Sequence, residues 1–160
     1  MLAQGGREAG AEHFGLMKAM HVSWFVSMLV EVFLLKRPFI PWLAGLATLF
    51  VALGQSLRLA AIRTLGWRWS LRIISMPEET PVQEGIYLHI RHPNYLGVIL
   101  EILAVPLLHS AYLTSLVFSL LNAAMLRVRI RTEENAIYDY QKVFHNAPRF
   151  LPELQQVRIE

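Results

Sequence analysis

The sequence contains no cysteine, and only 17% of its 160 residues are charged. The absence of cysteine excludes disulfides, thiol nucleophiles, cysteine-ligated zinc and iron–sulfur clusters. The net charge of +3 is small, and the basic residues do not form the dense patch that nucleic-acid binding requires. A glycine-rich phosphate loop is also missing, which argues against P-loop and dinucleotide-binding folds. No group of metal ligands is visible, so we expect no metal centre.

Apolar residues, in contrast, are abundant. They make up 54% of the chain, above the roughly 45–50% of soluble domains, and the mean hydropathy is +0.38. Since a transmembrane helix needs about 20 apolar residues, we predict a single all-α integral membrane domain over residues 1–160, with about four transmembrane helices. The spans are residues 20–35, residues 38–57 and two antiparallel helices within residues 95–126, which Pro106 and His109-Ser110 divide.

Residues 64–94 separate the second and third spans and are polar and basic. Their aromatic and β-branched residues partly alternate with polar ones, which predicts two short strands around residues 76–80. Near the beginning of the chain, the pattern from Glu12 onward predicts a short amphipathic helix at the membrane surface.

Lysine and arginine are distributed unevenly between the two ends of the predicted spans. One end carries Lys36 and Arg37, whereas the other carries Arg7, Lys18, Arg63, Arg68, Arg72, Arg91, Arg127, Arg129 and Arg131. Cytoplasmic loops are enriched in these residues. We therefore expect the 64–94 loop and the C-terminal segment to face the cytoplasm together.

Two polar strings stand at this end of the spans. The first precedes the third span and reads Gly85-Ile-Tyr87-Leu-His89-Ile-Arg91-His92-Pro93-Asn94-Tyr95-Leu96-Gly97. The second follows the last span and reads Arg129-Ile-Arg131-Thr132-Glu133-Glu134. Carboxylates near the C-terminal end of a helix oppose the helix dipole. They therefore call for a cationic partner, either an arginine or a positively charged ligand.

Together, the two strings resemble the isoprenylcysteine carboxyl methyltransferase family, which includes phospholipid N-methyltransferases. The resemblance covers roughly residues 60–152. The beginning of the chain, with Gly5-Gly6-Arg7-Glu8, and its end, with Arg149-Phe150-Leu151-Pro152, are similar to a bacterial branch linked to type III polyketide synthases. Members of that branch generally have one more apolar helix before the Gly-Gly segment. We therefore expect that this helix is absent here or that the chain begins after it.

The resemblance implies a methyltransferase of the bacterial inner membrane that uses S-adenosylmethionine at its cytoplasmic face. The implied cofactor-binding residues are Tyr87, His92, Pro93, Tyr95, Leu96, Gly97, Glu133 and Glu134. The implied catalytic residues are Arg91, Arg129 and Glu133, with the two arginines orienting an anionic acceptor oxygen or the cofactor carboxylate. A neutral acceptor would need a general base, for which His92 or His89 is available.

The acceptor would be lipophilic and would enter from the membrane. We rank an alkylpyrone or alkylresorcinol oxygen first, a prenylated or other lipid carboxylate second and a phospholipid amine third. Three further carboxylates are candidates for the acceptor site, because ionisable groups within membrane spans are costly and often functional. They are Glu31 and Glu101 within the apolar segments and Glu12 near the mouth of the site.

Two other functions remain open. Membrane sterol or enone reductases that use NADPH also resemble the Arg-His-Pro-Asn-Tyr-Leu-Gly string, but an acidic residue commonly follows that glycine, where this chain has Val98. A small scaffold without catalysis would explain the apolar composition, but not two polar strings at the same face.

Overall fold

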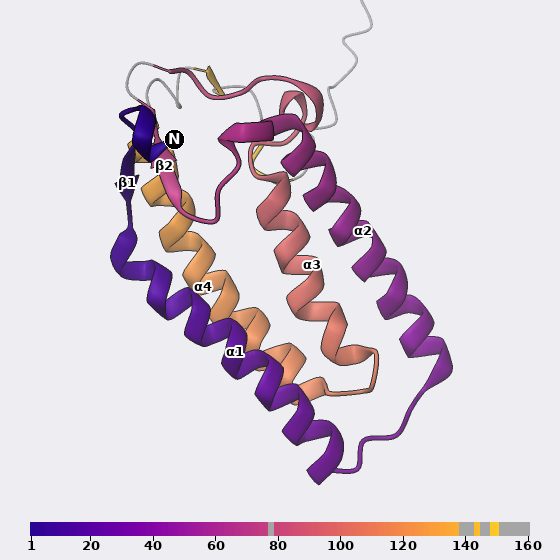
Figure 1. Cartoon of the computed structure of the whole chain (residues 1–160). Helices are drawn as coiled ribbons and strands as arrows, with labels where there is room; N and C mark the ends of the chain where they lie inside the picture. Colours follow the sequence, from indigo (N-terminus) through magenta and orange to yellow (C-terminus); the bar gives the residue numbers. More distant parts are fainter. Residues whose placement is uncertain (77–78, 138–142, 145–147, 151–160) are drawn as a thin grey trace, which may run out of the picture.

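The computed structural model describes residues 1–76, 79–137, 143–144 and 148–150, and four α-helices form most of it (Figure 1). They are α1 (Ala11–Leu34), α2 (Pro41–Leu65), α3 (Pro93–Leu107) and α4 (Tyr112–Ala136). The smaller elements are the 3-10 helices η1 (Leu2–Gln4), η2 (Gly66–Arg68) and η3 (Gly85–Leu88), and the strands β1 (Arg7–Ala9) and β2 (Ile73–Ser75).

Successive helices run antiparallel, and the packing order is α1, α4, α3 and α2. The chain start, the strands and the loop before α3 lie at one end of the bundle, and the α1–α2 and α3–α4 connections lie at the other (Figure 1). The predicted placement of the two polar strings at one end is therefore confirmed.

The surface of the bundle is that of a membrane protein. Large apolar side chains on the helices are widely exposed, including Phe33 at 72% and Trp42 at 72%. A soluble monomer rarely exposes such continuous apolar surface. Among the described residues, three helices are long and apolar enough to cross a membrane, namely α1, α4 and α2 taken together with η2 (Pro41–Arg68). The all-α membrane fold is confirmed, with α3 as a shorter fourth helix of 15 residues, about 22 Å long.

Proline sets the beginning of two helices. Pro41 and Pro93 each occupy a first helical position, where the missing N–H costs nothing and the fixed φ favours the helix. The predicted turn after Pro106 is also present. It includes Ser110 at a φ of 57°. The rings of His109 and of Phe39, in the α1–α2 connection at the same end of the bundle, lie with their centroids 5.6 Å apart.

The 64–94 loop contains one short strand in its described part instead of the two predicted around residues 76–80, a range in which residues 77 and 78 lie outside the described residues. The loop contributes only β2 among its described residues, and β2 pairs antiparallel with β1 from the chain start, with Glu8 opposite Ile74. The two strands are far apart in the sequence and no turn joins them, so the pattern of neighbouring residues could not identify β1 as the partner of β2. An ion pair between Arg72 and Glu8, 2.8 Å long, supports the pairing.

The predicted surface helix from Glu12 is also wrong as a separate element. Residues from Ala11 onward belong to α1, which continues without interruption to Leu34. Nothing between Lys18 and Met20 breaks the helix, so the amphipathic turns and the apolar span form one rod.

Helices α2 and α3 approach most closely at two glycines. A Cβ atom at Gly97 would stand 2.7 Å from the carbonyl oxygen of Gly54 and 2.5 Å from Cγ of Arg58. A Cβ atom at Gly54 would stand 3.0 Å from the carbonyl oxygen of Gly97. Small residues let helix backbones meet in membranes, where dispersion contacts drive association. The glycine that ends the first polar string is therefore a helix-packing residue.

Glu31 has a structural place at the far end of the bundle. Its side chain is only 5% exposed, and it accepts hydrogen bonds from the backbone N–H groups of Leu113 at 3.1 Å and Thr114 at 2.7 Å. These N–H groups belong to the first turn of α4 and have no partner within the helix. Arg37 pairs with the same carboxylate at 2.8 Å. Glu31 thus joins α1 to α4.

We predict that Gly97→Ala destabilises the bundle. Overpacking a tight contact costs roughly 1–3 kcal/mol, which outweighs the gain of about 1 kcal/mol from replacing a helical glycine. Gly45→Ala is the matched control, because a Cβ atom there meets nothing within 4 Å. Thermal unfolding in detergent should show a lower midpoint for Gly97→Ala only, and equal midpoints would contradict the assigned contact.

Candidate active site

The two polar strings meet where α3 begins and α4 ends. His92, which is 3% exposed, lies with its Nε2 atom 3.2 Å from Oε1 of Glu134. One turn further along α3, the hydroxyl of Tyr95 donates to Oε2 of Glu133 at 2.6 Å. The rings of His92 and Tyr95 stack with their centroids 5.4 Å apart. The two strings are therefore in direct contact, and Nδ1 of His92 also lies 3.9 Å from Oε1 of Glu133.

Arg149 completes this cluster from the C-terminal segment. Its Nε and Nη2 atoms donate to the two oxygens of Glu134 at 2.9 and 2.6 Å. The N–H groups of Arg91 and His92 donate to the carbonyl oxygens of Pro148 and Arg149 at 3.0 and 3.1 Å. Pro148 and Arg149 thus lie beside the Arg-His-Pro segment. The cation that Glu134 requires at this helix end is therefore an arginine of the chain itself.

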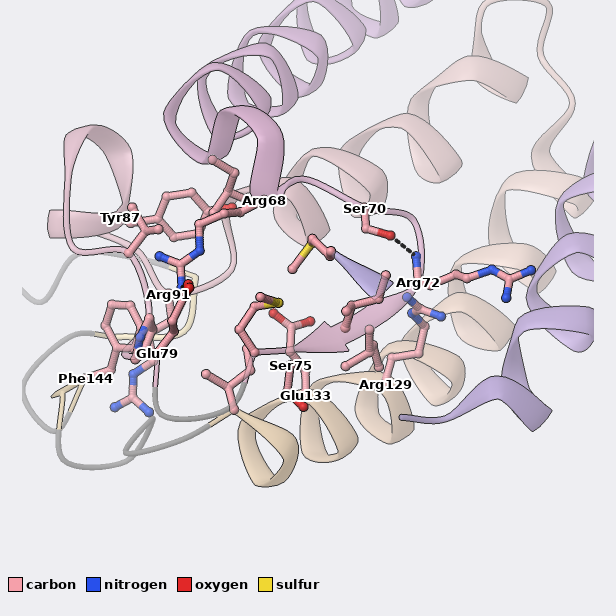
Figure 2. Close-up of a pocket in the computed structure, with 18 of the residues that line it drawn as sticks. Arg68, Ser70, Arg72, Ser75, Glu79, Tyr87, Arg91, Arg129, Glu133 and Phe144 are labelled. Carbon is pink, nitrogen blue, oxygen red and sulfur yellow. Dashed lines mark hydrogen bonds and ion pairs between the residues drawn. The ribbon is translucent and has the colours of Figure 1, made fainter. Parts of the chain in front are cut away.

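An outer cavity of about 130 Å³ lies between β2, the loop before α3 and the end of α4. Figure 2 shows Glu133 and Arg129 on the α4 side and Tyr87 and Arg91 on the opposite side. Its other polar lining residues are Arg68, Ser70, Arg72, Ser75, Glu79 and Tyr95.

An inner cavity of about 490 Å³ lies between the helices. This volume is within the usual range of ligand pockets, roughly 300–1,000 Å³. All four helices contribute to its lining, and α1 and α2 stand at opposite edges of the packing order. The apolar part of the lining includes Val22, Trp24, Val98, Ile102, Met125 and Leu126. Such a cavity suits a lipophilic molecule.

The two cavities share a polar wall. Tyr87, Arg91, Tyr95, Arg129 and Glu133 line both of them. Arg129 is only 4% exposed. Its Nη2 atom donates to the carbonyl oxygen of Leu71 at 2.9 Å, whereas its Nε has no partner among the described residues. Burial, and then the charge of Glu133, raise the pKa of Tyr87 well above its ordinary value. Tyr87 is therefore a neutral hydrogen-bond donor at any physiological pH.

The structure brings most predicted site residues together. The three predicted catalytic residues, Arg91, Arg129 and Glu133, lie in the shared wall, and Glu101 and His92 line the inner cavity. Glu134 lies behind His92 rather than in a cavity lining. The remaining predicted residues outside the linings of both cavities are Pro93, Leu96, Gly97, Glu12 and Glu31.

Other residues of the site gave little signal in the sequence. Trp24, Arg58 and Asn122 line the inner cavity from three different helices. Tryptophan and arginine near span ends are ordinary features of membrane proteins, so only their convergence indicates a role. Arg149 was visible only as part of the string at the chain end, and its bidentate contact with Glu134 depends on the fold.

Comparisons with known proteins agree with this arrangement. Residues 46–139 match the model of the isoprenylcysteine carboxyl methyltransferase family. The Bacillus subtilis protein YpbQ is 39% identical over 137 residues, which cover 86% of this chain and 81% of that protein. A protein-S-isoprenylcysteine O-methyltransferase of Schizosaccharomyces pombe is 34% identical over 87 residues, which cover 53% of this chain and 37% of the yeast protein.

A solved structure also shares the fold. The eukaryotic intramembrane Ras methyltransferase matches with a TM-score of 0.61 at 22% identity, over 82% of this chain and 49% of that one. The chain thus spans about half the length of that structure, and the likeness extends to the helical architecture alone.

We predict that Glu134→Gln loosens the contact between residues 148–150 and the Arg-His-Pro segment. Loss of the charged partner of Arg149 should speed amide hydrogen exchange at Arg91 and His92 by about 10-fold, or roughly 1.4 kcal/mol of local opening. Glu79→Gln, which removes a more exposed carboxylate 2.8 Å from Arg68, is the control. Unchanged exchange at both amides in Glu134→Gln would show that the ion pair between Arg149 and Glu134 does not hold this contact together.

Proposed function

The chain belongs to the isoprenylcysteine carboxyl methyltransferase family and is a membrane methyltransferase by that membership; we propose that it methylates a lipophilic acceptor with S-adenosylmethionine. The observation that carries the proposal is the shared wall, where a cavity with many charged side chains at the bundle end meets a mostly apolar cavity between the helices. We assign the outer cavity to the cofactor and the inner cavity to the acceptor.

The side chains around the outer cavity are suitable partners for the charged and polar groups of this cofactor. Bound S-adenosylmethionine supplies an electrophilic methyl group on a positively charged sulfur. Carboxylates and aromatic faces stabilise such cations, and Glu133, Tyr87 and Tyr95 all line the cavity. The arginines of the lining complement the carboxylate of the cofactor. Its amino and hydroxyl groups have Ser70, Ser75 and Glu79 as further polar partners.

The protein's contribution is alignment and electrostatics. The Tyr95 hydroxyl holds Glu133 in place at 2.6 Å, and Glu133 faces both cavities. Arg129 is fixed by the carbonyl of Leu71 at 2.9 Å, and its unpartnered Nε is available to an acceptor oxygen. Positioning the reacting groups removes much of the entropic barrier. An arginine that stabilises an ionised acceptor oxygen keeps it nucleophilic without a general base.

The charge of the shared wall selects among acceptors. Arg91 and Arg129 favour an acidic oxygen and disfavour a protonated amine. We therefore propose an alkylpyrone or alkylresorcinol oxygen as the first choice, followed by a lipid carboxylate such as that of a prenylated cysteine. The first choice would link the enzyme functionally to a type III polyketide synthase. The acceptor would enter the inner cavity from the membrane.

The orientation of the active site follows from charge. The bundle end that carries the site also carries most arginines, and we propose that it faces the cytoplasm of a bacterial cell. S-adenosylmethionine is then within reach from the aqueous side, and the acceptor from the bilayer.

We predict that the purified full chain binds S-adenosylmethionine saturably in calorimetry, and that Glu133→Gln raises the dissociation constant at least about 10-fold. Glu84→Gln, the same change at an exposed loop position, should leave it unchanged. A separate NADPH titration distinguishes the reductase, and binding of neither compound indicates a scaffold. Equal affinity in wild type and Glu133→Gln would remove Glu133 from the cofactor site.

We also predict that Arg129→Gln lowers kcat for methylation of an alkylresorcinol by about 100-fold, as for other electrostatic groups at a reacting oxygen. The affinity for S-adenosylmethionine should change much less, because Arg129 is assigned to the acceptor. Arg127→Gln on the same helix, outside both cavity linings, is the control. Loss of cofactor affinity equal to the loss of kcat would reassign Arg129 to the cofactor.

A further inference from the structure

An ion pair lies in the wall of the inner cavity, away from the shared wall. Nη1 of Arg58 on α2 donates to Oε2 of Glu101 on α3 at 2.7 Å, and both residues line the cavity. Glu101 is eight residues after Pro93, about 12 Å along the helix, which places it at the depth of the hydrocarbon chains. Ionisable groups at such depth are costly and usually functional.

The glycine contact between α2 and α3 builds this pair. Arg58 follows Gly54 by one helical turn, and Glu101 follows Gly97 by one turn. Because the helices are antiparallel and side chains lean toward the helix N-terminus, the two side chains reach toward each other. The stem of Arg58 crosses Gly97, where a Cβ atom would stand 2.5 Å from its Cγ. The pair is thus held at a fixed position by backbone contact.

The pair is not saturated with hydrogen bonds. Oε1 of Glu101 and Nε of Arg58 are buried and have no partner among the described residues. Nε1 of Trp24, on α1, is likewise buried and unpartnered, and Trp24 lines the same cavity. Buried polar atoms are almost always satisfied in folded proteins. These three atoms belong to residues that line one cavity, so a ligand bound there would supply the missing partners.

We propose that Arg58 and Glu101 form a second polar subsite, which binds a hydroxyl group of the acceptor other than the oxygen that is methylated. This inference rests on the assignment of the inner cavity to the acceptor. A hydroxyl donates to Oε1 of Glu101 and accepts from an N–H group, so one group satisfies both kinds of unpartnered atom. The acceptor class is then an amphipathic molecule with at least two oxygen functions and an alkyl chain.

The subsite also separates the candidate acceptors. A plain hydrocarbon or isoprenoid chain would leave the carboxylate oxygen and the N–H groups unpaired against apolar atoms, and the protein would bear their desolvation. A site built to bind a hydroxyl rejects analogues that lack it more strongly than a hydrophobic pocket rejects a change in chain length. The pair therefore favours an alkylresorcinol-like acceptor over a prenylated carboxylate.

Two acceptors of equal chain length test the proposal. A 5-alkylresorcinol carries two hydroxyls and the matching 3-alkylphenol carries one, and binding of each to the detergent-purified full chain is measured by calorimetry. Wild type should bind the resorcinol about 10- to 100-fold more tightly, as expected for a hydrogen bond to a charged group. In Glu101→Leu the two affinities should become nearly equal, whereas Glu101→Gln, which retains an acceptor oxygen, should keep part of the preference.

The outcomes are separable. A wild type that binds both compounds equally, or binds neither, overturns the subsite, as does a Glu101→Leu variant that keeps the full preference. If Glu101→Leu does not fold, loss of part of the preference in Glu101→Gln decides the question. Binding of S-adenosylmethionine and methyl transfer are measured on the same samples. If the chain prefers the resorcinol but neither binds S-adenosylmethionine nor transfers a methyl group, the proposed methyltransferase function is refuted while the polar subsite is supported.

Discussion

The burial of Glu134 at the end of α4 is the constraint on which the site depends. A carboxylate that is 4% exposed at the C-terminal end of a helix is unfavourable without cationic and hydrogen-bonding partners. His92 and Arg149 supply them, the first from the start of α3 and the second from the C-terminal segment. The same contacts place Tyr95 beside Glu133. One buried charge therefore joins three segments and orients the neighbouring carboxylate toward the cavities.

The sequence was sufficient for what depends on local pattern. Apolar segments of span length, divided at Pro106 and His109-Ser110, predicted the four helices, and the uneven distribution of lysine and arginine predicted that the two polar strings lie at one end of the bundle. The pairing of β1 with β2 was beyond such reasoning, because Glu8 and Ile74 are distant in sequence and each strand has only three residues. The pairing of Arg149 with Glu134 could not be predicted for the same reason. A charged residue in a polar segment has no local signature of its partner.

One residue type can also serve two different roles that give the same signal in the sequence. Gly97 ends a string that resembles a cofactor motif, yet its missing side chain serves the contact with Gly54 and the path of Arg58. Glu31 and Glu101 are both carboxylates within apolar helices, and sequence treats them alike. The structure separates them by their partners. The carboxylate of Glu31 is occupied by backbone N–H groups and Arg37, whereas one oxygen of Glu101 has no partner among the described residues.

Under the proposed function, the two cavities meet the geometric requirement of methyl transfer. An in-line displacement needs the donor and the acceptor on opposite sides of the migrating carbon, and a water-soluble donor and a membrane-soluble acceptor must also arrive from different phases. A cavity at the polar end and a cavity between the helices satisfy both needs if they share one wall. That wall holds the buried Arg129 and the tyrosine-bound Glu133, charges of opposite sign. Burial away from water strengthens the electric fields of these two charges. The low-dielectric surroundings that suit the lipophilic acceptor therefore also strengthen the electrostatic forces that would act on it.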